Sequence, residues 1–257
     1  MDNFKLYADY YNLIYEDKDY KKEAEYCIRH IKKFAPGAKN ILNLGCGTGM
    51  HDFVFAKNRF SVLGVDISEK MIALAKEHRE KLASRLRSKV HFTCSDIRLF
   101  RTDRQFDVVT SLFHVMSYQT SAKDVEAALA TAYRHLKPGG LFIFDFWYGP
   151  AVLFDKPEIR AKKFSGKKLE VTRIAVPQMH HMQNMVDVNY RLFIKEKNKN
   201  KITEIEELHR MRYFFMPEFL LWFEKHPFKV LRFCEWLSEN EPDISSWSAV
   251  FVLQKLR

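Results

Sequence analysis

Residues 41–49 read Ile-Leu-Asn-Leu-Gly-Cys-Gly-Thr-Gly, and this stretch decides the fold. Three of the nine glycines of the 257-residue chain, Gly45, Gly47 and Gly49, fall within it. A buried strand that turns sharply into a helix, and that lets a ligand approach its bare backbone, needs closely spaced glycines. The stretch therefore predicts a strand, a tight turn and a cofactor site.

The glycine spacing and the acids that follow it indicate an adenosine cofactor. The dinucleotide fingerprint G-x-G-x-x-G needs a glycine at position 50, where the chain has Met50. Asp66 follows the apolar run 61–65, at a strand end where a carboxylate accepts hydrogen bonds from ribose hydroxyls. Asp96 follows a third apolar run, 90–94. This ordered combination is much more specific than a lone G-x-G-x-G.

The ordered motifs resemble those of the class I S-adenosylmethionine-dependent methyltransferases. They are LNLGCGTG (42–49), GVDIS (64–68), SDI (95–97), FDVVTSLF (106–113) and LKPGG (136–140), and the resemblance covers residues 36–147. It implies S-adenosylmethionine as the cofactor, with the glycine turn under its methionine part, Asp66 and Ile67 at its ribose, and Asp96 and Ile97 at its adenine. The remaining cofactor contacts that we expect are Tyr15, Asn43, Gly45, Cys46, Gly47, Gly49, Met71 and Ser111.

One position departs from the family pattern. Asn43 stands where the family commonly has Asp. An amide keeps an acceptor oxygen but lacks the negative charge. We therefore expect a weaker contact with the cofactor's ammonium, or one arranged through water.

Apolar runs that alternate with helical patterns predict an α/β fold, a doubly wound Rossmann-like sheet with its active site at the carboxyl ends of the strands. Beyond residue 150, strictly alternating stretches predict a three-stranded antiparallel β excursion. A final pair of strands is expected to complete a seven-stranded, mostly parallel sheet with an antiparallel last strand. The expected core strands are 41–45, 61–65, 90–94, 107–111, 141–146, 228–235 and 247–254. The expected helices are 19–34, 49–58, 69–83, 122–136 and 218–225. The expected excursion strands are 169–176, 186–194 and 202–215, with a polar turn at 197–201.

This pattern divides the chain into four parts. We expect an N-terminal helical cap at 1–35 and an S-adenosylmethionine-binding core at 36–150. The β excursion, 151–215, is expected on the substrate side, and 216–257 ends the core sheet.

The formal charge of +10 comes from 42 Lys and Arg against 32 Asp and Glu. Because the two signs are interspersed and no basic-aromatic platform is present, the charge favours a solvated surface and a small anionic substrate over nucleic acid. No apolar run reaches the length of a membrane span, and residues 1–5 lack the shape of a signal peptide. We expect a cytoplasmic enzyme that binds no membrane. The exposed excursion strands leave a homodimer open.

The four cysteines carry little chemistry. Cys27, Cys46, Cys94 and Cys234 are scattered without metal-ligand spacing, so we expect reduced, structural thiols and no metal.

The end of the fourth strand distinguishes substrate classes. Enzymes that methylate nucleic-acid bases generally carry Asn or Asp, then Pro-Pro and an aromatic residue, whereas this chain has Ser-Leu-Phe-His at 111–114. Segments 111–118 and 145–150 and the tyrosine-rich start resemble N-methyltransferases of nucleotide-linked deoxyamino sugars. This weaker resemblance implies a small-molecule acceptor, a sugar nucleotide, bound by Phe113, Trp147, Tyr148, Arg173, Arg210 and Arg212. Each arginine suits a pyrophosphate, or else pairs with a surface glutamate.

The predicted chemistry requires positioning and the removal of one proton. His114 is the candidate base, and its alternative role is lining the pocket. Tyr11 is a second candidate for contact with the reacting groups, although Tyr7, Tyr11 and Tyr15 also fit the core-facing side of a helix. The functional alternatives are O-methylation of another metabolite, RNA methylation, and a cofactor-binding module without turnover.

Overall fold

The computed structural model describes residues 3–199 and 201–256, with side chains from residue 6 onward. The described chain forms two compact units. The larger contains Tyr20–Asp155 and the residues from Tyr213 onward, and the smaller contains Lys156–Arg212 with the residues up to Asp19. The four-part functional division at residues 35, 150 and 215 stays a prediction.

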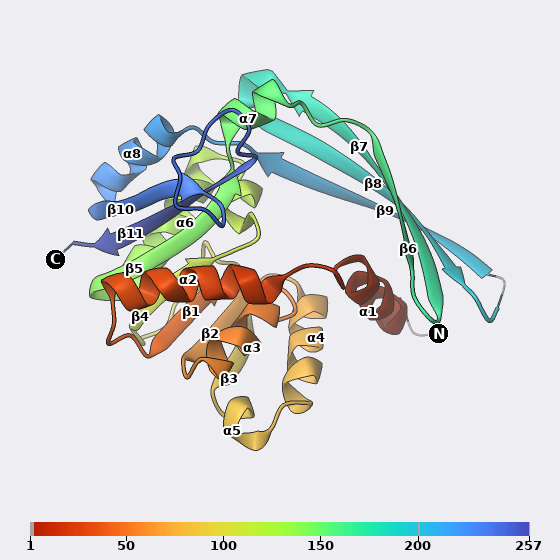
Figure 1. Cartoon of the computed structure of the whole chain (residues 1–257), viewed down its shortest axis with the longest axis horizontal. Coiled ribbons are helices and arrows are strands. Elements are labelled where there is room, and N and C mark those ends of the chain that lie inside the picture. Colours follow the sequence, from red (N-terminus) through yellow and green to blue (C-terminus); the bar gives the residue numbers. More distant parts are fainter. Residues whose placement is uncertain (1–2, 200, 257) are drawn as a thin grey trace. The chain divides into compact units, whose positions relative to one another are not determined.

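The larger unit is built on a seven-stranded sheet among the described residues, in the order β10-β11-β5-β4-β1-β2-β3 (Figure 1). Only β11 runs antiparallel to its neighbours, β5 and β10, while the other pairings are parallel. The predicted doubly wound, Rossmann-like fold with an antiparallel last strand is confirmed. The strands are β1 Asn40–Leu44, β2 Ser61–Asp66, β3 Val90–Cys94, β4 Phe106–Ser111, β5 Leu136–Trp147, β10 Phe228–Glu235 and β11 Ser248–Lys255.

Helices cover both faces of this sheet because its strands are apolar on both sides. In β5, Phe142 and Phe144 pack in a cluster with α6 and α8, whereas Leu141 and Ile143 pack in a second cluster with α2 and α3. This division follows the two-residue period of side chains along a strand. The helices are α2 Tyr20–Phe34, α3 Met50–Lys57, α4 Glu69–Glu80, α5 Ser84–Arg87, α6 Ala122–His135, α7 Gly149–Phe154 and α8 Met216–Lys225, with the 3-10 turn η1 Val115–Tyr118.

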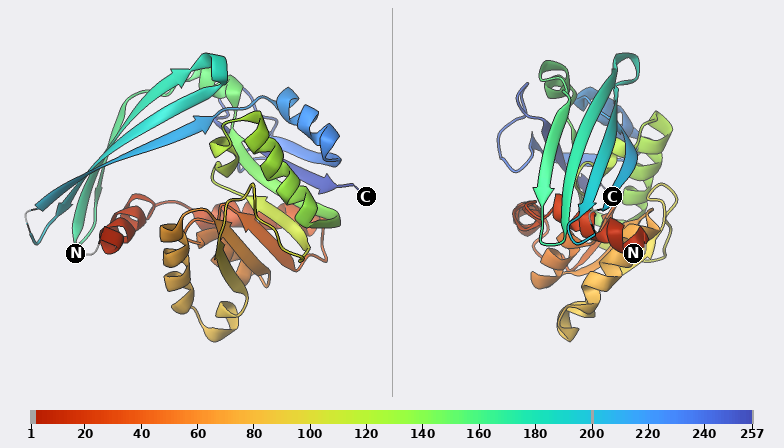
Figure 2. Two further views of the ribbon diagram at one scale, coloured as in Figure 1. Left: turned by 180° about the vertical axis from the view of Figure 1, so that it is seen from behind. Right: turned by 90° about the vertical axis from the view of Figure 1, so that its right-hand side faces the viewer.

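The smaller unit pairs helix α1 (Asn3–Ile14) with a four-stranded antiparallel sheet in the order β6-β7-β8-β9 (Figure 2). Leu6 and Tyr10 of α1 pack with buried residues of β7 and β8. The strands are β6 Arg160–Ser165, β7 Leu169–His180, β8 Met185–Glu196 and β9 Lys201–Arg212, with the 3-10 turn η2 His181–Gln183 between β7 and β8.

The prediction of a three-stranded excursion is wrong, because β6 adds a fourth strand. Its residues Arg160 to Lys163 are all exposed and carry three positive charges, so β6 lacks the apolar alternation that marks a half-buried strand. An edge strand needs only one neighbour, and β6 pairs with β7 alone. The predicted turn at 197–201 includes Asn200, which lies outside the described residues.

Candidate functional site

The glycine turn after β1 has the backbone conformation that its sequence predicts. Gly45, Gly47 and Gly49 have φ of 78°, 54° and 79°, in the left-handed region that favours glycine. The Gly45 N–H donates to the carbonyl of Val65 at 2.7 Å, which ties the turn to the end of β2. A Cβ on Gly45 would lie 2.4 Å from Cγ2 of Val115. The turn is therefore held from both sides by its own chain.

The middle glycine differs from its neighbours in facing open space. Apart from Gly47 and its two chain neighbours, no heavy atom of the described chain lies within 4 Å of the place where a Cβ on Gly47 would stand. Its N–H donates to Oδ2 of Asp66 at 2.8 Å. An open approach to bare backbone beside a carboxylate fits the methionine part and ribose of an adenosine cofactor. This observation supports the sequence prediction.

Asp66 and the residues after it begin the next helix. Its Oδ1 accepts from the Ser68 N–H at 2.9 Å, and the Ser68 hydroxyl accepts from the Met71 N–H at 3.3 Å to cap α4. Burial raises the pKa of Asp66. Each carboxylate oxygen has a second lone pair, so Asp66 can still accept ribose hydroxyls. Ile67 beside it is 64% exposed, so its apolar side chain is accessible to a ligand.

The Asn43 side chain is directed into the protein, toward a buried acid. Its Nδ2 donates to Oδ1 of Asp52 at 2.6 Å, and its Oδ1 accepts from the Thr110 hydroxyl at 3.0 Å. Asp52 is fully buried, and burial raises its pKa well above the usual value. An acid thus lies under the glycine turn, on α3. Sequence reasoning missed Asp52 because it is nine positions from Asn43 and has no motif of its own.

The residues at the end of β3 and around the glycine turn are partly accessible and partly buried. Asp96 binds Arg98, whose guanidinium holds the pKa of that carboxyl below its usual range, while Ile97 is buried in the main apolar cluster. Cys46 is buried in the turn, and burial raises the pKa of its thiol. The Ser111 hydroxyl at the end of β4 is buried without a hydrogen-bond partner among the described residues. It is thus a free polar group at the predicted site.

His114 is held by a buried carboxylate directly after β4. Phe113 and His114 have φ of 66° and 62°, so two successive non-glycine residues adopt the left-handed conformation. Such a conformation costs on the order of 1–3 kcal/mol per residue and persists where the surroundings enforce it. Oδ2 of Asp145, on β5, lies 2.7 Å from Nδ1 of His114 and accepts from its backbone N–H at 3.1 Å.

This arrangement leaves Nε2 as the imidazole nitrogen that does not face Asp145. Asp145 is fully buried, whereas the His114 side chain is 20% exposed. Asp145 is hydrogen-bonded to the backbone N–H of His114, whereas Nδ1 approaches Oδ2 without hydrogen-bond geometry. Sequence reasoning quoted Asp145 only as part of a segment and missed this pairing, because the two residues lie on different strands.

The aromatic residues after β5 pack on one another. The Trp147 ring lies edge-on to His114 with centroids 6.4 Å apart, and its backbone N–H donates to the Ser117 hydroxyl. Tyr148 packs against Phe233, and burial raises its pKa. The structure therefore brings Trp147 to His114. Their contact with substrate stays a prediction.

The tyrosines of the smaller unit form a continuous row. The rings of Tyr7 and Tyr11 are 6.0 Å apart, and those of Tyr11 and Tyr15 are 4.7 Å apart. This confirms that they share one side of α1 and its end. Tyr15 hydrogen-bonds to Arg173, and burial, opposed by that arginine, raises its pKa. The predicted roles of Tyr11 and Tyr15 at reacting groups and cofactor stay predictions.

The three predicted arginines lie on opposite faces of the four-stranded sheet. Register pairs place Arg173 opposite Leu192, whose face packs on α1. Arg210 is opposite Asp187, an odd position of β8, so Arg210 and Arg212 lie on the other face. Arg210 makes two bonds to Asp187, at 2.7 and 2.8 Å. Arg173 therefore lies on the opposite face of the sheet from Arg210 and Arg212, and the role of each arginine at a pyrophosphate stays a prediction.

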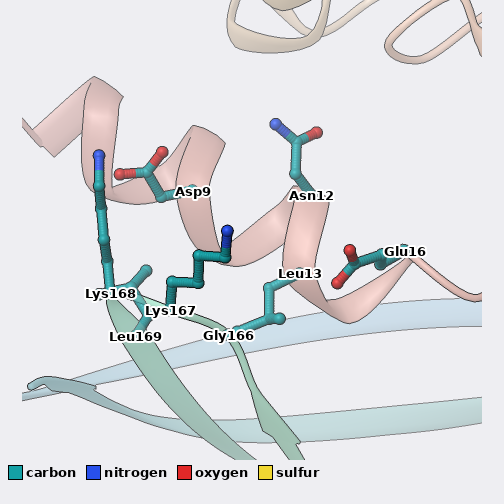
Figure 3. Close-up of a pocket in the computed structure, with 8 residues that line it drawn as sticks. All are labelled: Asp9, Asn12, Leu13, Glu16, Gly166, Lys167, Lys168 and Leu169. Atoms are coloured by element: carbon teal, nitrogen blue, oxygen red, sulfur yellow. The ribbon is translucent and has the colours of Figure 1, made fainter.

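A groove of about 330 Å³ lies in the smaller unit, between α1 and the β6–β7 turn (Figure 3). None of the predicted site residues lines it. The described residues contain no group of three potential metal ligands and no helix that is long and apolar enough to cross a membrane. The groove is lined by Asp9, Asn12, Leu13, Glu16 and Gly166 to Leu169.

Comparisons with known proteins agree with this geometry. Residues 41–140 match a family model described as a methyltransferase domain. A 151-residue segment, 58% of the chain, is 32% identical to the dTDP-3-amino-3,4,6-trideoxy-α-D-glucopyranose N,N-dimethyltransferase of Streptomyces venezuelae and covers 60% of that enzyme. A longer segment, 80% of the chain, is 26% identical to the dTDP-3-amino-3,6-dideoxy-α-D-glucopyranose N,N-dimethyltransferase of Streptomyces fradiae and covers 77% of it.

Solved structures show the same fold over the whole chain. An S-adenosylmethionine-dependent methyltransferase from Clostridium acetobutylicum superposes with a TM-score of 0.82 at 20% identity, over 98% of each chain. DesVI from Streptomyces venezuelae superposes with a TM-score of 0.79 at 22% identity, over 100% of this chain and 99% of that one.

Proposed function

We propose that this chain, a class I S-adenosylmethionine-dependent methyltransferase by its domain at residues 41–140, methylates the amino group of a nucleotide-linked amino sugar. The observation that carries the proposal is the site itself. An open left-handed glycine turn lies beside the Asp66 carboxylate, and a carboxylate-held His114 follows β4. The names of the similar enzymes support the acceptor class.

The residues present fit the cofactor. Gly47 leaves room for it, Asp66 retains acceptor lone pairs for its ribose, and exposed Ile67 offers an apolar surface. When bound, S-adenosylmethionine supplies an activated methyl group on a sulfonium. The chain needs no nucleophile of its own, so its contribution is to hold the acceptor amine in line and to remove one proton.

His114 is the residue that we propose for the proton. Asp145 accepts from the backbone N–H and lies beside Nδ1, so Nε2 is directed away from the carboxylate. Asp145 is therefore a positioning residue. The free-base amine loses one proton when it forms the methylated product, and an imidazole can accept that proton. Trp147 lies edge-on to this ring.

In the smaller unit we propose Arg173 as the phosphate-binding arginine. Its guanidinium lies over the rings of Tyr190 and Phe164, at 5.0 and 5.5 Å from their centroids, so its position is fixed by stacking. Arg210 is already bound twice by Asp187. Arg173 therefore has more capacity for a pyrophosphate.

The test is methyl transfer from radiolabelled S-adenosylmethionine to a panel of thymidine-diphosphate and uridine-diphosphate amino sugars, with hydroxyl acceptors and bulk RNA beside them. Label on a nucleotide amino sugar supports the proposal. Label only on RNA or on a hydroxyl would replace it with the corresponding alternative. Cofactor binding without any transfer would favour a binding module.

Two pairs of variants test the residue roles. His114→Gln and Asp145→Asn should both lower kcat and change the dependence of kcat on pH. Arg173→Gln should raise KM for the nucleotide-linked acceptor and leave KM for a phosphate-free amino sugar unchanged. Arg210→Gln is its matched control. Equal KM effects on both acceptors would remove Arg173 from phosphate binding.

A further inference from the structure

Arg98, in the loop after β3, binds the Asp96 carboxylate with three of its N–H groups. Its backbone N–H donates to Oδ1 of Asp96 at 2.8 Å, its Nε lies 3.0 Å from both carboxylate oxygens, and its Nη2 donates to Oδ2. The same contacts hold the pKa of Asp96 below its usual range. Asp96 is therefore an ionised acceptor at neutral pH.

The other end of the Arg98 guanidinium is anchored on helix α6. Its Nη1 donates to Oδ1 of Asp124 at 2.6 Å. Asp124 is itself fixed, because its Oδ2 accepts from the Ser121 hydroxyl at 2.6 Å and its backbone N–H donates to the same hydroxyl at 3.1 Å. Both ends of the planar guanidinium are thus held, which fixes its orientation. The position of the Asp96 side chain is set from a separate element, the first turn of α6.

The bound carboxylate of Asp96 keeps one acceptor site. An ionised carboxylate has about four lone-pair sites, and the backbone N–H, Nε and Nη2 of Arg98 occupy all but one of them. The remaining site can accept a single N–H from a ligand. It cannot donate, so a ligand that presents a carbonyl oxygen there meets a fixed negative charge. The 6-amino group of adenine supplies such an N–H, whereas a 6-oxopurine presents a carbonyl oxygen.

We propose that Arg98, anchored by Asp124, is a positioning residue that makes the cofactor site select a 6-aminopurine over a 6-oxopurine. This role rests on the proposed function, whose cofactor carries an adenine that the motif at 95–97 assigns to Asp96. Arg98 acts through Asp96 and not by contact with the cofactor. Because the carboxylate is already ordered, it accepts from an amino group without a further loss of side-chain freedom. For the same reason it cannot turn away from an oxo group.

Calorimetric titration with two ligands tests this role. One is S-adenosylhomocysteine, the cofactor without its methyl group, and the other is S-inosylhomocysteine, which has a 6-oxopurine in place of adenine. The wild-type chain should bind the adenosyl ligand at least about tenfold more tightly, the worth of one hydrogen bond to a charged group. In Arg98→Gln the affinity for the adenosyl ligand should fall, and that for the inosyl ligand should not. The ratio of the two affinities should therefore drop at least about threefold.

Three further variants separate the orientation of Asp96 from charge and from stability. Arg98→Lys keeps the positive charge but lacks the planar fork, so its ratio should drop as well. Asp124→Asn weakens the anchor at Nη1 and should lower the ratio by a smaller factor. Arg101→Gln is the matched control, since Arg101 lies in the same loop and donates to the Thr131 hydroxyl of α6 at 3.0 Å. It should reduce stability to urea and leave the ratio unchanged.

A merely structural role for Arg98 would weaken the binding of both ligands by one factor. An unchanged ratio in Arg98→Gln, or an equal drop in Arg98→Gln and Arg101→Gln, would overturn the proposal. A wild-type chain that binds the two ligands equally would overturn it too. If circular dichroism shows that Arg98→Gln does not fold, Arg98→Lys and Asp124→Asn decide by the same ratio. A wild-type chain that binds neither ligand would remove the proposed function as well, whereas normal binding with an unchanged ratio leaves that function standing.

Discussion

An exchange of the buried amide and acid under the glycine turn tests how the cofactor site is supported. Asn43 and Asp52 are 1% and 0% exposed, and 2.6 Å separates Nδ2 of the first from Oδ1 of the second. Asn43→Asp alone sets two carboxyl groups against each other. Asp52→Asn alone exchanges an acid for an amide and weakens the bond. The double variant reverses donor and acceptor, and the new carboxylate at position 43 still accepts from Thr110.

The structure sets the expected free energies of unfolding. A buried polar group that loses its hydrogen-bond partner costs about 1–3 kcal/mol, and two adjacent buried carboxyls cannot both ionise. We expect Asn43→Asp to cost about 3 kcal/mol and Asp52→Asn about 1–2 kcal/mol. The double variant retains both hydrogen bonds and should cost under about 1 kcal/mol. The coupling free energy between the two positions is then about 3 kcal/mol.

Urea unfolding of all four proteins measures this coupling, and calorimetric titration with S-adenosylmethionine measures whether the turn recovers. The double variant should bind the cofactor better than Asn43→Asp does. Asn198→Asp is the matched control, since it makes the same chemical change at an exposed position in the turn after β8. Additive losses in the double variant would show that the two side chains do not act as a pair and would refute the reasoning.

Three further predictions concern the same region. Burial raises the pKa of Asp52, so the folded chain keeps the carboxyl proton of Asp52 to higher pH than the unfolded chain does. The stability of the wild-type chain to urea, compared with that of Asp52→Asn, should therefore fall as the pH rises above about 4. Gly45→Ala should lower the melting temperature because its Cβ meets Val115. Gly47→Ala should cost about 1–2 kcal/mol of strain and chiefly weaken cofactor binding. If Gly45→Ala chiefly weakened binding and Gly47→Ala chiefly lowered the melting temperature, the ligand would lie elsewhere. Asp66→Ala should abolish cofactor binding in calorimetry, and normal affinity would contradict its assignment to the ribose.

The sequence by itself determined the core fold and the location of the glycine turn. A strand, a glycine turn and the next acid are local patterns, and their order along the chain was sufficient to predict the parallel sheet and Asp66. The β excursion was recognised from the alternation in β8 and β9. Strand β6 was missed because an exposed basic edge strand has no apolar period.

Only the tertiary structure decided which side chains meet. Asp145 reaches His114, and Asp52 reaches Asn43, across separate elements. Strand register alone sets Arg173 and Arg210 on opposite faces of one sheet, since a shift of one residue moves a side chain to the other face. Periodicity along a chain specifies which elements form. Contacts between elements depend on packing and register, which no local pattern encodes.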